Sequence, residues 1–136
     1  MADVRVKLEW EKQGLVFHGG AVGGLELRID GNTKVAISPV QAMLVSLVAC
    51  TAADVVDILE KMRVPLAGLV VRADGDRAKE PPRRYTAIRL IYEAEGLAVE
   101  SEDKLQRAIQ LSHEKYCSVM HSLASDIEIT TQVVLS

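Results

Sequence analysis

The sequence has few of the residues that mark several common classes of protein. Aromatic side chains make up 4% of its 136 residues, and it contains two cysteines and four prolines. Two cysteines cannot supply the disulfide framework on which small secreted domains depend. The first 13 residues also lack the basic-then-apolar order of a secretory signal, so we expect a cytoplasmic protein whose cysteines are free thiols or a catalytic redox pair.

The sequence also lacks a strong excess of charge of either sign. Its 16 basic and 19 acidic residues give a formal net charge of −3. Such a chain has no general attraction for phosphate backbones or anionic lipid surfaces, so we expect no nucleic-acid partner. The charge-free stretch that ends at Ala53 is interrupted by Ser38, Pro39 and Gln41. We interpret this stretch as too short and too polar for a membrane span, which needs about 20 mostly apolar residues.

Motifs of several enzyme classes are missing as well. The glycines at 19, 20, 23 and 24 lie between two strand patterns and are not followed by Lys-Ser/Thr, which argues against a phosphate-binding loop. The sequence contains neither a Gly-x-Ser-x-Gly elbow nor a Cys-x-x-Cys pair. These absences argue against a nucleotide-binding enzyme, a serine hydrolase and a thioredoxin.

What is present is the composition of a globular protein. Hydrophobic residues make up 49% of the chain and charged residues 26%. A chain of this length usually forms one hydrophobic core. We therefore expect one domain over residues 1–136.

The sequence of the first third of the chain predicts an antiparallel meander. Val4, Val6, Leu8 and Trp10 alternate with charged residues, which is the period of a half-buried strand. Two further strand patterns cover residues 15–18 and 25–29, with a glycine-rich turn predicted at 19–24 between them. A turn at residues 30–32 ends the meander.

A long helix is predicted over residues 39–63. Ser38 supplies a cap and Pro39 a first-turn proline, and no further glycine or proline occurs before Pro65. The helix is apolar on nearly every face as far as Ala53, so its first half should be buried on all sides. The rest of so short a chain offers too little cover, which favours a partner subunit.

The remaining sequence predicts two more strands, two helical segments and a closing strand. The strands cover residues 69–71 and 85–92, joined by a polar loop at 74–84 that we interpret as a solvated hairpin tip. Ser101 should cap a helix whose inward stripe is Leu105, Ala108, Ile109 and Ser112. Residues 117–124 are helical by composition, and residues 127–135 alternate as a strand. The predicted order βββ–α–ββ–α–α–β belongs to the α+β class.

The residues alone leave the chemistry open. His113, Cys117 and His121 are spaced by four, so an unbroken helix would place them on one face as metal ligands can be. Three ligands leave a fourth to be found, and we expect no metal and no cofactor. Cys50 lies within the apolar helix, where a cysteine is usually a small core residue. Cys117 lies near a predicted helix start, where the thiolate is favoured and a protonated His121 could assist it.

Two segments resemble a known protein family. Residues 38–51, which run from a proline-led start to Cys50, and the following residues 54–63 resemble the central helix of the OsmC and organic hydroperoxide resistance (Ohr) family. Residues 113–119 are similar to the family's second cysteine segment. The separation of the two cysteines, 117 − 50 = 67 residues, fits the family as well.

This resemblance implies an OsmC-like fold, in which antiparallel sheets wrap around a long central helix of an intertwined homodimer. It also implies a thiol-dependent peroxidase with active sites at the subunit interface. In the family pattern Cys50 is the peroxidatic thiol, which attacks an organic hydroperoxide and becomes a sulfenic acid. Cys117 is the resolving thiol, which forms a disulfide with Cys50, and a dithiol reductant resets the pair.

The sequence departs from the family at the residues that assist the reacting cysteine. Strongly active members have a glutamate after the helix-leading proline, where this chain has Val40, and they pair it with a hairpin arginine that has no clear counterpart here. Gln41 lies on the opposite helix face from Cys50. Asp54 would oppose a thiolate. Two alternatives therefore stay open: a non-enzymatic dimeric binding protein for a hydrophobic small molecule, and a thiol redox sensor.

Overall fold

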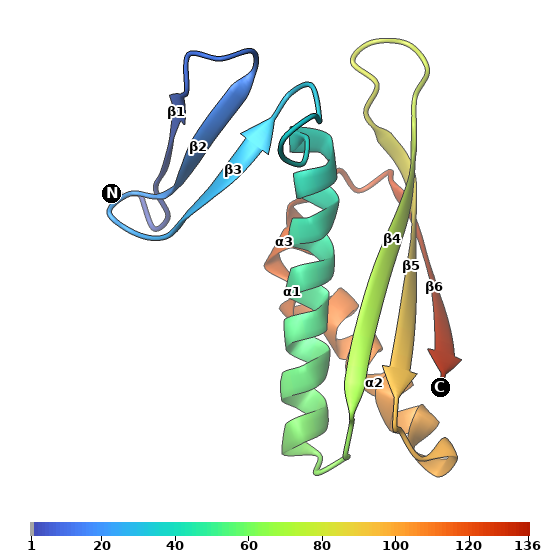
Figure 1. The fold of residues 1–136 in the computed structure, drawn as a ribbon. Helices are drawn as coiled ribbons and strands as arrows, with labels where there is room; N and C mark the ends of the chain where they lie inside the picture. Colours follow the sequence, from blue (N-terminus) through green and yellow to red (C-terminus); the bar gives the residue numbers. More distant parts are fainter. Residues whose placement is uncertain (1) are drawn as a thin grey trace. The chain divides into compact units, whose positions relative to one another are not determined.

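The computed structural model describes residues 2–136, and the predicted order of strands and helices is confirmed (Figure 1). The chain divides into two compact units, one ending at Met43 and one running from Leu44 to Ser136. The first unit contains a small sheet, and the second contains the sheet and helices that hold both cysteines.

The sheet of the first unit is the predicted antiparallel meander. Strands β1 (Val6–Trp10), β2 (Val16–Ala21) and β3 (Glu26–Asp30) pair in the order β1-β2-β3. The predicted turn at 19–24 was wrong in its first half, because Gly19 and Gly20 belong to β2. A Cβ atom on Gly20 would lie 2.1 Å from the carbonyl oxygen of Leu25, so only glycine fits this close pairing of strands.

Strand β1 is exposed along its whole length. The structure confirms the alternating strand that the sequence predicts, but it does not confirm half-burial, because all five residues of β1 are exposed. Val6, Leu8 and Trp10 on β1 and Leu27 on β3 are among the exposed large hydrophobic residues. The single chain thus leaves apolar side chains of this small sheet in solvent.

Helix α1 (Pro39–Lys61) matches the predicted long helix closely. Its start is fixed by a reciprocal cap: the backbone N–H of Gln41 donates to Ser38 Oγ at 3.1 Å, and that of Ser38 donates to Gln41 Oε1 at 3.0 Å. Gln41 therefore has a structural role at the helix start.

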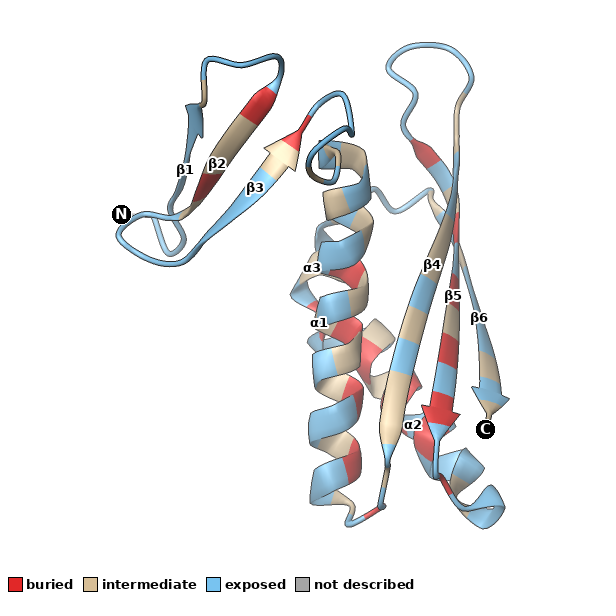
Figure 2. Cartoon of the chain, in the orientation of Figure 1, coloured by how far each residue is buried: buried red, intermediate tan, exposed pale blue. Residues whose placement is uncertain are grey.

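One face of α1 is buried and the others are not. Its buried residues follow one another at intervals of four: Leu47, Thr51, Val55 and Leu59 (Figure 2). The prediction that the apolar half is buried on all sides is wrong for the single chain, because Val45 is 52% exposed. By length and composition alone α1 could cross a membrane. Core helices of soluble proteins pass the same test, so the length and composition of α1 are weak evidence for a membrane span.

The sheet of the second unit consists of β4 (Gly68–Arg77), β5 (Tyr85–Glu95) and β6 (Glu128–Leu135). Strands β4 and β5 are antiparallel, whereas β5 and β6 are parallel, so the prediction of purely antiparallel sheets is corrected to a mixed sheet. Parallel neighbours need a crossover connection, which the helices between β5 and β6 supply. The predicted polar loop shortens to residues 78–84, because β4 continues to Arg77.

The crossover contains η1 (Val99–Ser101), α2 (Glu102–Leu111), η2 (Ser112–Tyr116) and α3 (Ser118–Ser122). The inward stripe predicted for α2 is confirmed, since all four of its residues are buried. Ser101 stands at the predicted N-cap, but its side chain makes no capping hydrogen bond. Buried side chains of α1, α2 and β5 form the core, among them Leu47, Leu59, Leu105, Ile88, Leu90 and Tyr92.

Candidate functional site

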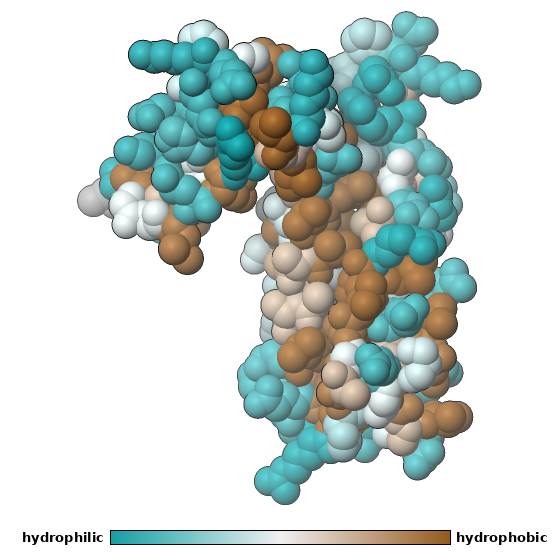
Figure 3. All heavy atoms as spheres, in the orientation of Figure 1, coloured by the Kyte–Doolittle hydropathy of each residue, from teal (hydrophilic) through white to brown (hydrophobic). Residues whose placement is uncertain are grey.

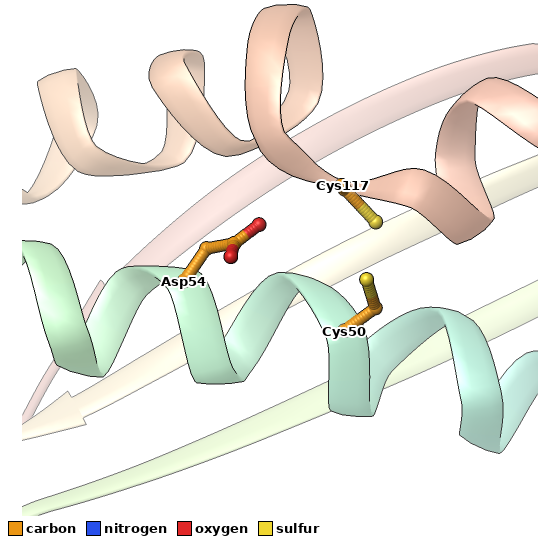
Figure 4. A group of neighbouring side chains, drawn as sticks. All are labelled: Cys50, Asp54 and Cys117. Carbon is orange, nitrogen blue, oxygen red and sulfur yellow. The ribbon is translucent and has the colours of Figure 1, made fainter. Parts of the chain in front are cut away.

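The fold brings the two cysteines and one carboxylate together. Cys50 and Asp54 lie one turn apart on α1, and Cys117 lies between η2 and α3. The two sulfur atoms and a carboxylate oxygen of Asp54 are all within 4.8 Å of one another. Figure 4 shows the sulfur of Cys117 directed toward that of Cys50, with Asp54 beside them. Both cysteines are free thiols.

A local widening of the helix places Cys117. Residues Ser112–Tyr116 form a π-helical turn in which the backbone N–H of Cys117 donates to the carbonyl oxygen of Ser112 at 2.8 Å. Such turns interrupt a regular helix and are frequent at functional sites. Cys117 itself is extended, with φ −76° and ψ 101°, and its Sγ accepts a hydrogen bond from Met120 N–H at 3.3 Å. The side chain thereby points away from the α2 axis and toward α1.

The prediction of a favoured thiolate at Cys117 was wrong. Burial raises the pKa of the Cys117 thiol to about 11, the Met120 N–H opposes this rise, and Cys50 and Asp54 add to it. Helix α3 has only five residues, so its N-terminus contributes too little to outweigh the lost hydration. Cys117 is therefore protonated at neutral pH, and His121 is exposed.

Asp54 is held in place by a residue that the sequence interpretation assigned only to the core. Ser112 Oγ donates to Asp54 Oδ2 at 2.9 Å, which joins the crossover to α1 beside the sulfurs. Ser112 is fully buried. Its one visible signal in the sequence was a polar residue at an inward position of an otherwise apolar stripe.

A second polar contact connects β5 to the crossover. Tyr92 is fully buried, and its hydroxyl lies 2.6 Å from His113 Nε2. Burial raises the pKa of Tyr92 to about 12, and a hydrogen bond with Thr51 opposes this rise. Burial also lowers the pKa of His113. This pair is neutral at neutral pH and contributes no cation to the thiols.

The predicted row of His113, Cys117 and His121 does not form. The π-helical turn and the extended Cys117 interrupt the helix on which the three residues would share a face. His113 contacts Tyr92, whereas His121 lies on α3 in solvent. The cluster that contains Cys117 includes an aspartate and the other cysteine in place of the two histidines.

A groove of about 580 Å³ borders the site on the Asp54 side. Its lining combines polar and apolar side chains: Asp54, Asp57, Ile58, Lys61, Met62, Leu111 and Tyr116. The groove gives small molecules a route to the carboxylate end of the cluster.

Strand β3 of the first unit contains one arginine, Arg28, which is paired with Glu11. Its Nε and Nη2 atoms donate to the two carboxylate oxygens of Glu11 at 3.1 and 2.8 Å. The hydrogen bond from Arg28 is the main reason that the pKa of Glu11 is lowered. This ion pair belongs to the first unit and gives Arg28 a structural partner.

Comparison with known proteins gives the same fold over most of the chain. A family model described as OsmC-like protein matches residues 30–132. Protein YhfA of Escherichia coli K12 is 34% identical over 128 residues, which cover 93% of this chain and 94% of YhfA.

Solved structures are similar over the full length. A hypothetical protein from Aquifex aeolicus VF5 aligns with a TM-score of 0.84 at 26% identity, covering 100% of this chain and 98% of that one. An organic hydroperoxide resistance protein OsmC from Legionella pneumophila aligns with a TM-score of 0.69 at 16% identity, covering 98% of each chain.

Proposed function

The chain belongs to the OsmC-like protein family, and from this membership we propose that it is a thiol peroxidase for organic hydroperoxides. The observation that carries the proposal is the approach of Cys50 and Cys117, whose sulfurs lie within 4.8 Å of each other. Sulfur atoms that face each other at this separation are suited to disulfide formation, which requires two cysteine side chains that point toward one another.

Cys50 is the attacking thiol in this proposal. Its thiolate forms a bond to one oxygen of the hydroperoxide, the O–O bond breaks, and the alkoxide takes up a proton and leaves as an alcohol. The sulfur loses two electrons to the peroxide and becomes a sulfenic acid. Cys50 is only partly buried whereas Cys117 is fully buried, so Cys50 is the more accessible of the two.

Cys117 then resolves the sulfenic acid. Its sulfur bonds to that of Cys50, and its proton leaves with the sulfenic hydroxyl as water. Because the thiolate is the nucleophile, the proton that the raised pKa keeps on Cys117 must leave as the S–S bond forms. A dithiol reductant then exchanges with the disulfide, which returns both thiols and oxidises the dithiol.

We also propose that residues 1–136 act as one OsmC-like domain within a cytoplasmic, intertwined homodimer. The exposed apolar residues of α1 support a partner subunit, among them Met43, Val45 and Val56 (Figure 3). Exposed apolar side chains that gather on one helix often mark an interaction site.

A second candidate is a dimeric binding protein for a hydrophobic small molecule. Val40 stands where strongly active relatives have glutamate, and Arg28 is paired with Glu11, so an activating charge pair for Cys50 is lacking among the described residues. The groove beside Asp54 contains apolar side chains that suit such a ligand. The candidates differ in whether the thiols are consumed by oxidant. The third hypothesis is a thiol redox sensor. Oxidant would oxidise the two thiols of such a sensor, but the reductant would not support repeated turnover of hydroperoxide.

The test follows thiol oxidation in reduced protein after addition of cumene hydroperoxide or hydrogen peroxide. Wild type should consume the organic hydroperoxide faster and form one intramolecular disulfide, seen by mass spectrometry. Cys50→Ser should lose the reaction by about a hundredfold or more. Cys117→Ser should stop at a sulfenic acid that dimedone labels. A wild-type rate no higher than that of a free thiol would exclude the peroxidase and favour the binding protein.

A further inference from the structure

We propose that Cys50, Asp54 and Cys117 form a binding site for a thiophilic divalent metal ion of the zinc class. Two sulfurs and a carboxylate oxygen converge within 4.8 Å, from residues that are buried or half-buried. Of the row His113, Cys117 and His121 that the sequence indicated, only Cys117 takes part in it.

The ligand atoms converge because of the helix period. Cys50 and Asp54 are four residues apart on α1, so their side chains lie on one face. Cys117 approaches that face from the π-helical turn (Figure 4). In a tetrahedral zinc site with bonds of about 2.3 Å, two sulfurs lie roughly 3.8 Å apart. The observed upper limit of 4.8 Å between the ligand atoms is compatible with that separation.

The charges around the cluster favour a cation. The charged groups that act on the Cys117 thiol are Cys50 and Asp54, and both are anionic when ionised. The histidine nearest in the crossover, His113, is engaged by Tyr92. A bound dication would displace the thiol protons and would offset the mutual repulsion of the resulting thiolates and the Asp54 carboxylate.

The surroundings also resemble those of a metal ligand set. Ser112 Oγ donates to Asp54 Oδ2, which fixes the carboxylate and leaves its other oxygen available. Metal-bound carboxylates are usually hydrogen-bonded in this way. Two thiolates select zinc or another thiophilic ion over Mg²⁺ and Ca²⁺. With three protein ligands, the fourth position is open to water or a small molecule, and the groove beside Asp54 leads to it.

A metal ion and a disulfide would compete for the same sulfurs. The metal site does not rest on the peroxidase proposal, because binding requires no hydroperoxide. Either proposal can therefore fail while the other stands.

The test titrates Co²⁺ into the reduced, chelator-treated full chain. We expect one ion per chain, thiolate-to-cobalt charge-transfer bands in the near ultraviolet, strong visible bands of tetrahedral cobalt, and displacement by Zn²⁺. Cys50→Ser and Cys117→Ser should lose the charge-transfer intensity of one thiolate each. Asp54→Asn should weaken Zn²⁺ binding, and Ser112→Ala should weaken it by about tenfold or more.

Glu60→Gln is the matched control, because Glu60 is an exposed carboxylate of α1 that does not line the groove beside Asp54. It should bind Zn²⁺ as wild type does, and circular dichroism confirms that each variant is folded. Octahedral cobalt bands without charge transfer, Zn²⁺ affinity unchanged in both cysteine variants, or equal loss in Glu60→Gln would overturn the proposal.

Discussion

At the scale of single residues, the surroundings of Cys117 could not be predicted from its position in the sequence. A cysteine before a helix is expected to favour the thiolate, but α3 is short and the side chain is fully buried. Burial depends on α1 and β5, which lie far away in the sequence. The pairing of the two cysteines came from family resemblance, whereas the contact between Ser112 and Asp54 had no sequence signal strong enough to predict it.

His113 offers a residue-scale test of burial. The pKa of His113 is lowered in the folded protein. Above the ordinary histidine pKa of about 6.5, His113 is therefore neutral in both the folded and the unfolded state, and it does not reduce the free energy of unfolding. As pH falls through 6.5 toward the lower folded pKa, the unfolded state takes up a proton that the folded state does not. The free energy of unfolding should therefore fall by up to about 1.4 kcal/mol per pH unit in this window.

Urea unfolding of wild type and His113→Gln at pH 7.5 and 5.5 measures this effect. Between pH 7.5 and 5.5 the free energy of unfolding should decrease less in the variant than in wild type, whatever the stability of the variant at pH 7.5. His121→Gln is the control, because His121 is exposed, and it should keep the wild-type decrease. An identical pH dependence in wild type and His113→Gln would show that the burial of His113 has no such linkage.

At the scale of elements, local patterns predicted most of the structure. Ser38 and Pro39 marked the start of α1, and alternation marked the strands, because caps and side-chain periods are local properties. The errors arose where distant segments decide. Gly19 and Gly20 have the composition of a turn, but they lie in β2. These positions require glycine because the neighbouring strands approach too closely for a side chain.

The buried stripe of α1 gives an element-scale prediction. Leu59 is 1% exposed and Val56, on another face of the same helix, is 45% exposed. Leu59→Ala should lower the free energy of unfolding by about 2–5 kcal/mol, because it removes core contacts and leaves a cavity. Because Val56 faces the proposed partner subunit, the matched control is Val99→Ala, at a position 77% exposed on η1, and it should cost under about 1 kcal/mol in urea unfolding. Similar losses in both variants would contradict the assignment of the buried face.

At the scale of the whole molecule, the sequence predicted the α+β class and the element order, but not the parallel pairing of β5 with β6. The direction of a closing strand depends on how the crossover returns to the sheet, which no local pattern encodes. The need for a partner subunit came from the apolar character of α1. In the single chain the apolar face of α1 is not covered, since Val45 is half exposed.

The proposed homodimer gives the last prediction. Light scattering should find a mass of about twice the 14.8 kDa of one chain. Val45→Asp places a carboxylate on the exposed apolar face of α1, where burial against a partner would cost several kcal/mol, so this variant should elute as a monomer at micromolar concentration. Val99→Asp is the control, because Val99 is 77% exposed on η1, outside that helix face, and it should stay dimeric. Circular dichroism establishes that both variants are folded. If Val45→Asp keeps the wild-type mass, the exposed face of α1 is not the dimer interface, because a stable interface of about 800 Å² per partner cannot tolerate an unpaired charge near its centre.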